Sequence, residues 1–122
     1  MNILLLGGGG YIGNIVAEFF LKKNCSLTIL DNFIFDHKYS INNLKKYKKF
    51  TVIYKSINEK KYLEKIIKDF DSIILLSGLV GDPITKKYPD YSNLVNFKGV
   101  QNAIDVALKN EIKKFIFIST CS

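Results

Sequence analysis

Glycines dominate the segment that follows the first apolar run of the chain. From residue 6 onward the order is Leu-Gly-Gly-Gly-Gly-Tyr-Ile-Gly. Two spacings fit this segment: Gly8, Gly10 and Gly13 form G-x-G-x-x-G, and Gly7, Gly10 and Gly13 form G-x-x-G-x-x-G. Either spacing permits a sharp turn, a close approach of bare backbone to an anion, and a helix whose N–H groups face that anion. The sequence leaves the frame open but predicts a phosphate-binding turn.

Asp31 lies roughly 20 residues beyond these glycines, directly after the next apolar run, where a dinucleotide site needs an acidic side chain. A carboxylate at this point accepts hydrogen bonds from both hydroxyls of the adenine ribose. It also repels a 2′-phosphate, and no arginine follows it to neutralise such a group. We therefore expect the cofactor to be NAD and not NADP.

The apolar pattern predicts five strands separated by helices. Short apolar runs indicate buried parallel strands at residues 2–6, 26–30, 50–54, 72–77 and 115–118. Helical spacing indicates helices at 10–23, 59–68 and 91–109, and Ser40 is predicted to cap a further short helix. This alternation predicts an α/β fold, a Rossmann-type doubly wound parallel sheet of order 3-2-1-4-5 with helices on both faces, truncated after strand 5. We expect one domain, residues 1–122, with its ligand between strands 1 and 4.

Two of the predicted helices carry apolar residues at the spacing of a single face. In the first helix, the residues expected to share that face are Ile12, Ile15, Val16, Phe19 and Phe20. In the helix at 91–109, the residues expected to point inward are Leu94, Val95, Ala103, Ile104 and Leu108.

Composition narrows the partners. The net charge is +7, but all 18 basic residues are lysines, and arginine is the usual side chain for phosphates and guanine edges, so we do not expect nucleic acid as a partner. No apolar run approaches the roughly 20 residues of a membrane span, and the first residues lack the basic start of a signal peptide, so a cytoplasmic location is expected. Cys25 and Cys121 match no zinc spacing, and no metal site is predicted.

Several segments, taken together and in order, resemble the extended short-chain dehydrogenase/reductase family, the NAD-dependent sugar-nucleotide epimerases and dehydratases. The resemblance begins with Gly-Gly-x-Gly-Tyr-Ile-Gly and spans the whole chain. The other matching segments are Asp31-Asn32, Leu75-Leu76-Ser77-Gly78, Asn96-Phe97-Lys98-Gly99 and Phe115-Ile116-Phe117-Ile118-Ser119-Thr120.

The resemblance implies a role for each matching residue. It implies that Thr120 is catalytic and hydrogen-bonds the reacting hydroxyl of a nucleotide-sugar substrate. Where the family commonly has Asp followed by Ile or Leu near the adenine, this chain has Ser56-Ile57. The residues expected to bind the cofactor are Gly7, Gly10, Tyr11, Ile12, Gly13, Asp31, Asn32, Ser56, Ile57, Leu76, Ser77, Gly78 and Asn96.

The family's chemistry also requires a Tyr-x-x-x-Lys after the fifth strand, and these 122 residues do not contain it. We therefore expect the chain to hold NAD but to be inactive alone. Thr120 is followed by Cys121 and Ser122, whereas the 4,6-dehydratases of the family have Asp and Glu there, which favours an epimerase or reductase. A non-catalytic NAD-binding sensor or docking module is the alternative, and a flavodoxin-like domain is disfavoured because glycines replace the acids it needs. An uncovered fifth strand predicts a marginal, aggregation-prone or homodimeric chain.

Overall fold

Five parallel strands form one sheet in the order β3-β2-β1-β4-β5, which confirms the predicted topology. The structure is a computed structural model, and it describes residues 1–32, 38–76, 90 and 94–118. The third and fourth strands end one and two residues earlier than predicted, and the fifth is displaced by one. The strands are β1 (Asn2–Leu6), β2 (Ser26–Leu30), β3 (Phe50–Ile53), β4 (Ser72–Leu75) and β5 (Lys114–Phe117).

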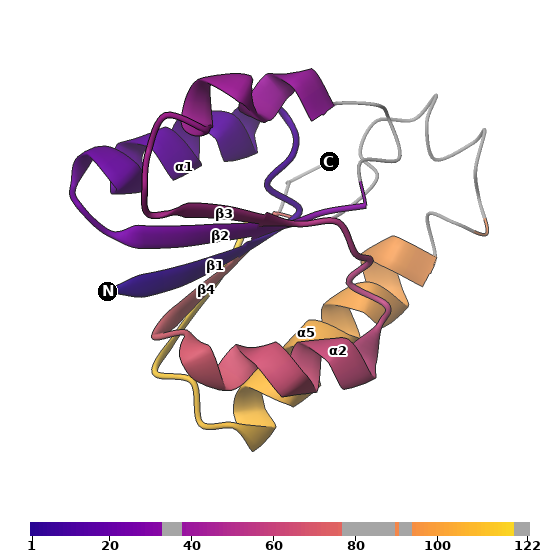
Figure 1. Ribbon diagram of the computed structural model, residues 1–122. Helices are drawn as coiled ribbons and strands as arrows, with labels where there is room; N and C mark the ends of the chain where they lie inside the picture. The colour runs from indigo at the N-terminus through magenta and orange to yellow at the C-terminus, as the bar shows by residue number, and fades with distance from the viewer. Residues whose placement is uncertain (33–37, 77–89, 91–93, 119–122) are drawn as a thin grey trace.

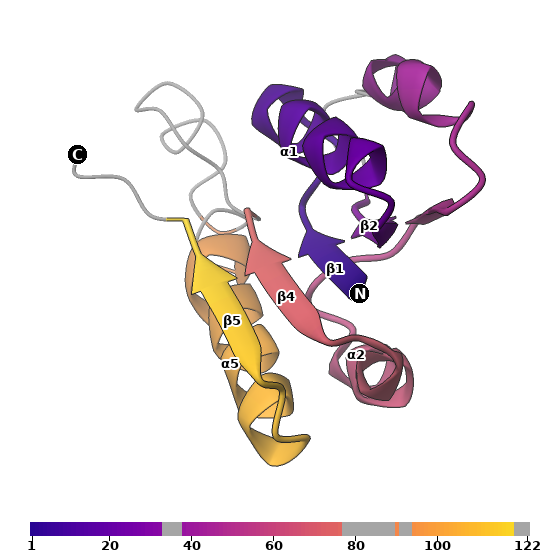
Figure 2. The ribbon, with the colours of Figure 1, turned by 90° about the vertical axis from the view of Figure 1, so that its left-hand side faces the viewer.

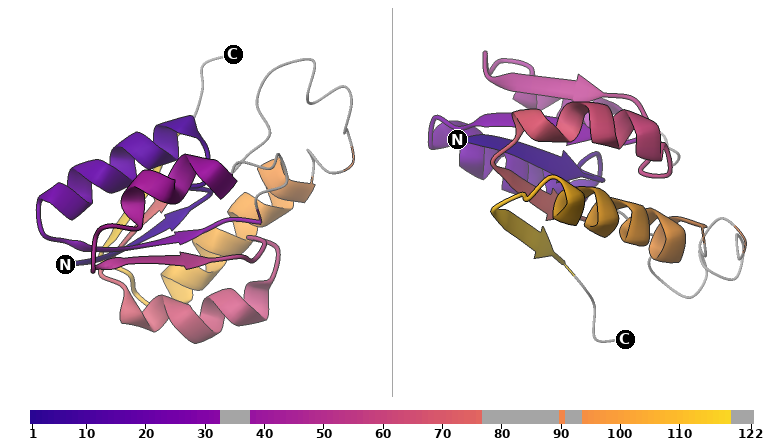
Figure 3. Two further views of the ribbon diagram at one scale, coloured as in Figure 1. Left: turned by 45° about the horizontal axis from the view of Figure 1, so that its top comes forward. Right: turned by 90° about the horizontal axis from the view of Figure 1, so that it is seen from below.

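Helices cover both faces of the sheet (Figures 1 and 2). The α-helix α1 (Tyr11–Lys22) and the 3-10 helix η1 (Lys38–Leu44) lie side by side on one face, as the left view of Figure 3 shows. On the other face lie α2 (Lys60–Ile66) and α5 (Val100–Lys109), seen from below in the right view of Figure 3. A short 3-10 helix, η2 (Ile67–Asp69), extends α2, and a π-helix, η3 (Leu94–Gly99), precedes α5. Within the described residues, no helix has the length and apolar character needed to cross a bilayer.

Each face of the sheet has its own apolar core, because side chains alternate along every strand. Leu4 and Leu6 of β1 pack with Leu63 and Val106 on the side of α2 and α5. Their neighbours in β1, together with Ile29 of β2, pack with residues of α1 and η1 on the other side. The strands are apolar at both alternations, which is what a parallel sheet buried on both faces requires.

The buried face of α1 differs from the predicted one. Gly13, Ala17 and Leu21 are buried against the sheet, whereas Ile12, Ile15 and Phe19 are 61%, 55% and 55% exposed. Val16 and Phe20 are half-buried, so the prediction holds for these two residues and is wrong for the other three. The reason is steric, because a helix approaches a sheet closely only along a row of small side chains. Periodicity identified an apolar stripe, but not the one that is covered.

Prediction of the inward face of α5 fails for the same reason. Ala103, Val106 and Ala107 are buried, while Ile104 is 39% and Leu108 73% exposed, so only Ala103 lies where it was predicted. The single helix predicted at 91–109 is, in its described part, a π-helix followed by an α-helix, and the side chains of Leu94 and Val95 lie outside the described residues.

The short helix on the α1 face also begins earlier than expected. It starts at Lys38, so Ser40 lies within it and not at its N-terminal cap, and the prediction of a cap was wrong. At the other edge, β5 has one strand neighbour, and its Ile116 and Phe117 are each 47% exposed. This agrees with the expectation of an uncovered edge, but self-association stays a prediction.

Replacement of Asn43 by alanine should lower the free energy of unfolding by about 0.5–1 kcal/mol, measured by urea denaturation. The Asn43 amide joins η1 to α1: its Oδ1 accepts from Asn14 Nδ2 at 2.6 Å, and its Nδ2 donates to Glu18 Oε2 at 3.0 Å. Asn42 is exposed in the same turn and is the matched control, so Asn42→Ala should change stability by less than about 0.5 kcal/mol. Equal effects of the two changes would contradict a joining role.

Candidate functional site

The glycine turn joins β1 to α1 through a backbone that only glycine adopts readily. Gly7 has a φ of 82°, in the left-handed region that disfavours side chains. Its N–H donates to the carbonyl of Leu30 at 2.8 Å, so the first residue of the turn is tied to the end of β2. The chain then reverses and enters α1 at Tyr11.

The other glycines of the turn differ in what surrounds them. A Cβ on Gly13 would lie 2.5 Å from Gly8 Cα and closer still to the Gly8 carbonyl oxygen, so the helix packs directly on the turn. A Cβ on Gly8 would lie 2.7 Å from Leu5 Cδ2. A Cβ on Gly10 would meet nothing within 4 Å. Gly7, Gly8 and Gly13 are therefore required by the chain's own packing, and both possible spacings have a structural reason.

The open space at Gly10 lies at the N-terminus of α1. Gly10 is the N-cap residue, and it offers no side-chain hydrogen bond to the helix. The first turn of α1 carries no acidic residue. N–H groups at a helix start and the positive end of the helix dipole favour an anion. Tyr11 and Ile12, both predicted to bind the cofactor, lie in this first turn with exposed side chains.

Asp31 contacts the glycine turn directly. Its Oδ2 accepts a hydrogen bond from the Gly9 N–H at 2.9 Å, and its own N–H donates to the carbonyl of Ile53 at 3.1 Å. The half-buried carboxylate is therefore held at the carboxyl end of β2, beside the turn. Asn32, the next predicted residue, is exposed. Sequence reasoning missed the part played by Gly9, although the four consecutive glycines were a signal that each one is used.

The remaining predicted residues are placed unequally. Leu76 is half-buried just after β4, and its N–H donates to the carbonyl of Leu6 at 2.8 Å, which joins the carboxyl ends of β1 and β4. Ile57 is only 4% exposed and packs in the core on the α2 side, so its side chain does not face a ligand. Ser56 is half-buried, and Asn96 lies in η3. Ser77, Gly78 and Thr120 lie outside the described residues.

These features fit a bound dinucleotide. A sharp glycine turn, a helix N-terminus with space in front of Gly10 and a fixed carboxylate at the end of the neighbouring strand meet where the strand order reverses. The fold and this site define a dinucleotide-binding domain of the Rossmann type.

Residues 3–122 match the model of the NAD dependent epimerase/dehydratase family, and the chain belongs to that family. The resemblance predicted from the sequence is confirmed. The family is NAD dependent, which confirms the predicted cofactor at the level of the family.

Known relatives cover the whole of this chain but extend well beyond its length. A UDP-N-acetyl-alpha-D-glucosaminuronate decarboxylase from Bacillus cytotoxicus is 31% identical over 96% of this chain and 36% of that protein. A UDP-glucose 4-epimerase from Halalkalibacterium halodurans is 27% identical over 100% of this chain and 35% of its own length. The solved structure of a Bacillus cereus UDP-glucuronic acid 4-epimerase, in complex with UDP-glucuronic acid and NAD, superposes with a TM-score of 0.90 at 26% identity. The match covers 100% of this chain and 41% of that one.

Proposed function

We propose that residues 1–122 form the NAD-binding part of a sugar-nucleotide epimerase or reductase. The observation that carries this proposal is the hydrogen bond between Asp31 and Gly9, because it fixes a ribose-binding carboxylate beside a phosphate-binding turn. The family supplies the class of enzyme, and the similar proteins named above act on UDP-sugars. The comparisons give no support to the alternative of a non-catalytic sensor or docking module.

In this proposal, the residues of the chain hold and orient the cofactor. The N–H groups at the start of α1 bind the pyrophosphate, and the space at Gly10 lets it approach the backbone. Asp31 keeps Oδ2 on Gly9 and accepts from the ribose hydroxyls. Bound NAD supplies transient hydride acceptance from a sugar carbon.

Turnover needs two further contributions. We propose that Thr120 hydrogen-bonds the reacting sugar hydroxyl, as the family resemblance implies. A tyrosine and lysine in the spacing Tyr-x-x-x-Lys would then move the proton, and the 122 residues contain no such pair. We therefore propose that the chain binds NAD without turning over a sugar nucleotide on its own.

A calorimetric titration of the chain with NAD and with NADP tests this proposal. NAD should bind at least about tenfold more tightly, because the Asp31 carboxylate loses its hydrogen bonds to the 2′-hydroxyl and repels a phosphate there. Tighter binding of NADP would overturn the assignment of Asp31, and no binding of either dinucleotide would overturn the proposed function.

A further inference from the structure

The segment after β3 lies where the base of the bound nucleotide should fall. The strand order places β2 between β1 and β3, so the glycine turn, Asp31 and residues 54–58 follow one another outward along the carboxyl edge of the sheet. A nucleotide that lies across this edge presents its pyrophosphate, ribose and base in the same order. This step rests on the proposed function, because it takes the direction of the nucleotide from the turn and from Asp31.

Ser56 is a hydroxyl at this position, and its acceptor capacity is already used. Its Oγ accepts from the Asn58 N–H at 3.1 Å and from Asn58 Nδ2 at 3.4 Å. A serine hydroxyl has two lone pairs and one hydrogen. With both lone pairs engaged inside the loop, Ser56 faces a ligand only as a hydrogen-bond donor.

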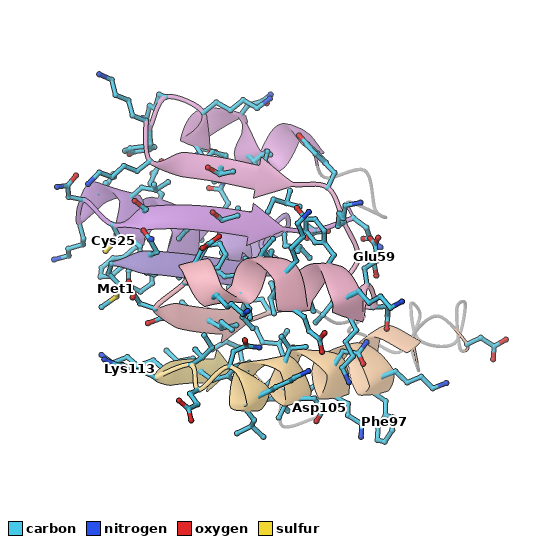
Figure 4. The ribbon with its side chains drawn as sticks, turned by 60° about the horizontal axis from the view of Figure 1, so that its bottom comes forward. Met1, Cys25, Glu59, Phe97, Asp105 and Lys113 are labelled. Atoms are coloured by element: carbon cyan, nitrogen blue, oxygen red, sulfur yellow. The ribbon has the colours of Figure 1, made fainter. Side chains whose placement is uncertain are left out.

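The two neighbouring acceptors are also withheld from a base. Asn58 Oδ1 is buried and has no hydrogen-bond partner among the described residues, so solvent and ligand alike are kept from it. Glu59 lies at the start of α2, at the edge where the strands end (Figure 4). Its Oε2 accepts from the Ser56 N–H at 3.1 Å, and its Oε1 pairs with Lys55 Nζ at 3.7 Å. Both Glu59 oxygens are therefore engaged within the chain.

We propose that this site does not select the 6-amino group of adenine and binds 6-amino and 6-keto purine dinucleotides with similar affinity. Selection of the amino group requires an acceptor, and the Ser56 hydroxyl offers only a hydrogen. That hydrogen can be donated to a ring nitrogen of adenine or to the 6-oxygen or a ring nitrogen of hypoxanthine. A site that leaves neither partner unsatisfied discriminates weakly between them.

Parallel calorimetric titrations with NAD and with nicotinamide hypoxanthine dinucleotide test the proposal. For the unchanged chain, the two Kd values should agree within about threefold. Ser56→Asp adds an acceptor for the amino group and places like charges near the 6-oxygen, so it should shift the ratio of Kd values at least about tenfold towards NAD. Because the first measurement uses the unchanged chain, the proposal is tested even where the variant does not fold.

Three controls separate the source of any selectivity. Asn24→Asp adds the same charge in the turn before β2, beside Cys25 at the opposite edge of the sheet (Figure 4), and should leave the ratio unchanged. Ser56→Ala should weaken both dinucleotides without changing their ratio. Glu59→Gln should also leave the ratio unchanged, and a shift there would make Glu59 the acceptor and overturn the proposal.

The outcomes distinguish this inference from the function on which it rests. NAD binding with at least tenfold weaker binding of the hypoxanthine dinucleotide would overturn the inference alone. Failure of both to bind would overturn the proposed function and the inference with it.

Discussion

Replacement of Asp31 by alanine should weaken NAD binding about a hundredfold, which corresponds to roughly 3 kcal/mol of binding free energy. Two losses combine in this variant. The ribose hydroxyls lose a charged acceptor, and the Gly9 N–H loses the 2.9 Å hydrogen bond that fixes the turn. The preference for NAD over NADP should fall to near one, because no carboxylate remains to repel the 2′-phosphate. Calorimetric titration with both dinucleotides measures the two effects.

Asp71 supplies the matched control for this experiment. Its Oδ2 also accepts from a backbone N–H, that of Asn2 at 2.8 Å, but it precedes β4 at the opposite edge of the sheet. Asp71→Ala should leave NAD affinity within about twofold of the unchanged chain. A loss of less than threefold in Asp31→Ala, or an equal loss in both variants, would contradict a direct role for Asp31.

Gly13→Ala should both destabilise the chain and abolish NAD binding. The added carbon has no space, since it would lie 2.5 Å from Gly8 Cα and the obstructing atoms are backbone. Either α1 moves away from the turn or the turn is rebuilt, and an overpacked contact of this kind lowers the free energy of unfolding by about 1–3 kcal/mol. Urea denaturation gives the stability, and titration of the folded fraction gives the affinity.

Gly10→Ala makes the same chemical change where the chain leaves room. Nothing lies within 4 Å of the added carbon, and the backbone at Gly10, with a φ of −90°, accepts alanine. The free energy of unfolding should stay within about 0.5 kcal/mol of the unchanged chain, while NAD affinity should fall at least about tenfold as the carbon enters the space for pyrophosphate. Unchanged NAD affinity in Gly10→Ala would show that the cofactor does not approach this glycine.

Sequence alone specified the parts of the fold that depend on a periodic pattern. The strands at residues 2–6 and 26–30 were predicted with their observed limits, and the order of all five strands followed from their alternation with helices. The position of Asp31 at the end of β2 followed in turn, because the strand ends where its apolar run ends. The placement of this side chain beside the turn was therefore predictable to within one contact.

The parts that sequence did not specify depend on size and on local exchange of hydrogen bonds. Helix α1 is apolar along two stripes, and only the packed structure shows that the stripe with Gly13 and Ala17 is the covered one. The contact of Asp31 with Gly9, and the use of the Ser56 lone pairs by Asn58, are partner choices that residue spacing does not encode. The π-helix before α5 was missed because one inserted residue per turn leaves no clear mark on apolar periodicity.

The close seating of α1 has a consequence for how this chain can change over generations. Along its outer flank, Ile12, Ile15 and Phe19 contribute little to the core, so inherited substitutions there are tolerated by the fold of these residues. At Ala17, buried one turn beyond Gly13, each added carbon pushes the helix axis outward and carries the N–H groups of its first turn away from the phosphate. Drift in the cofactor site is thus limited by a methyl-sized side chain that never touches the cofactor.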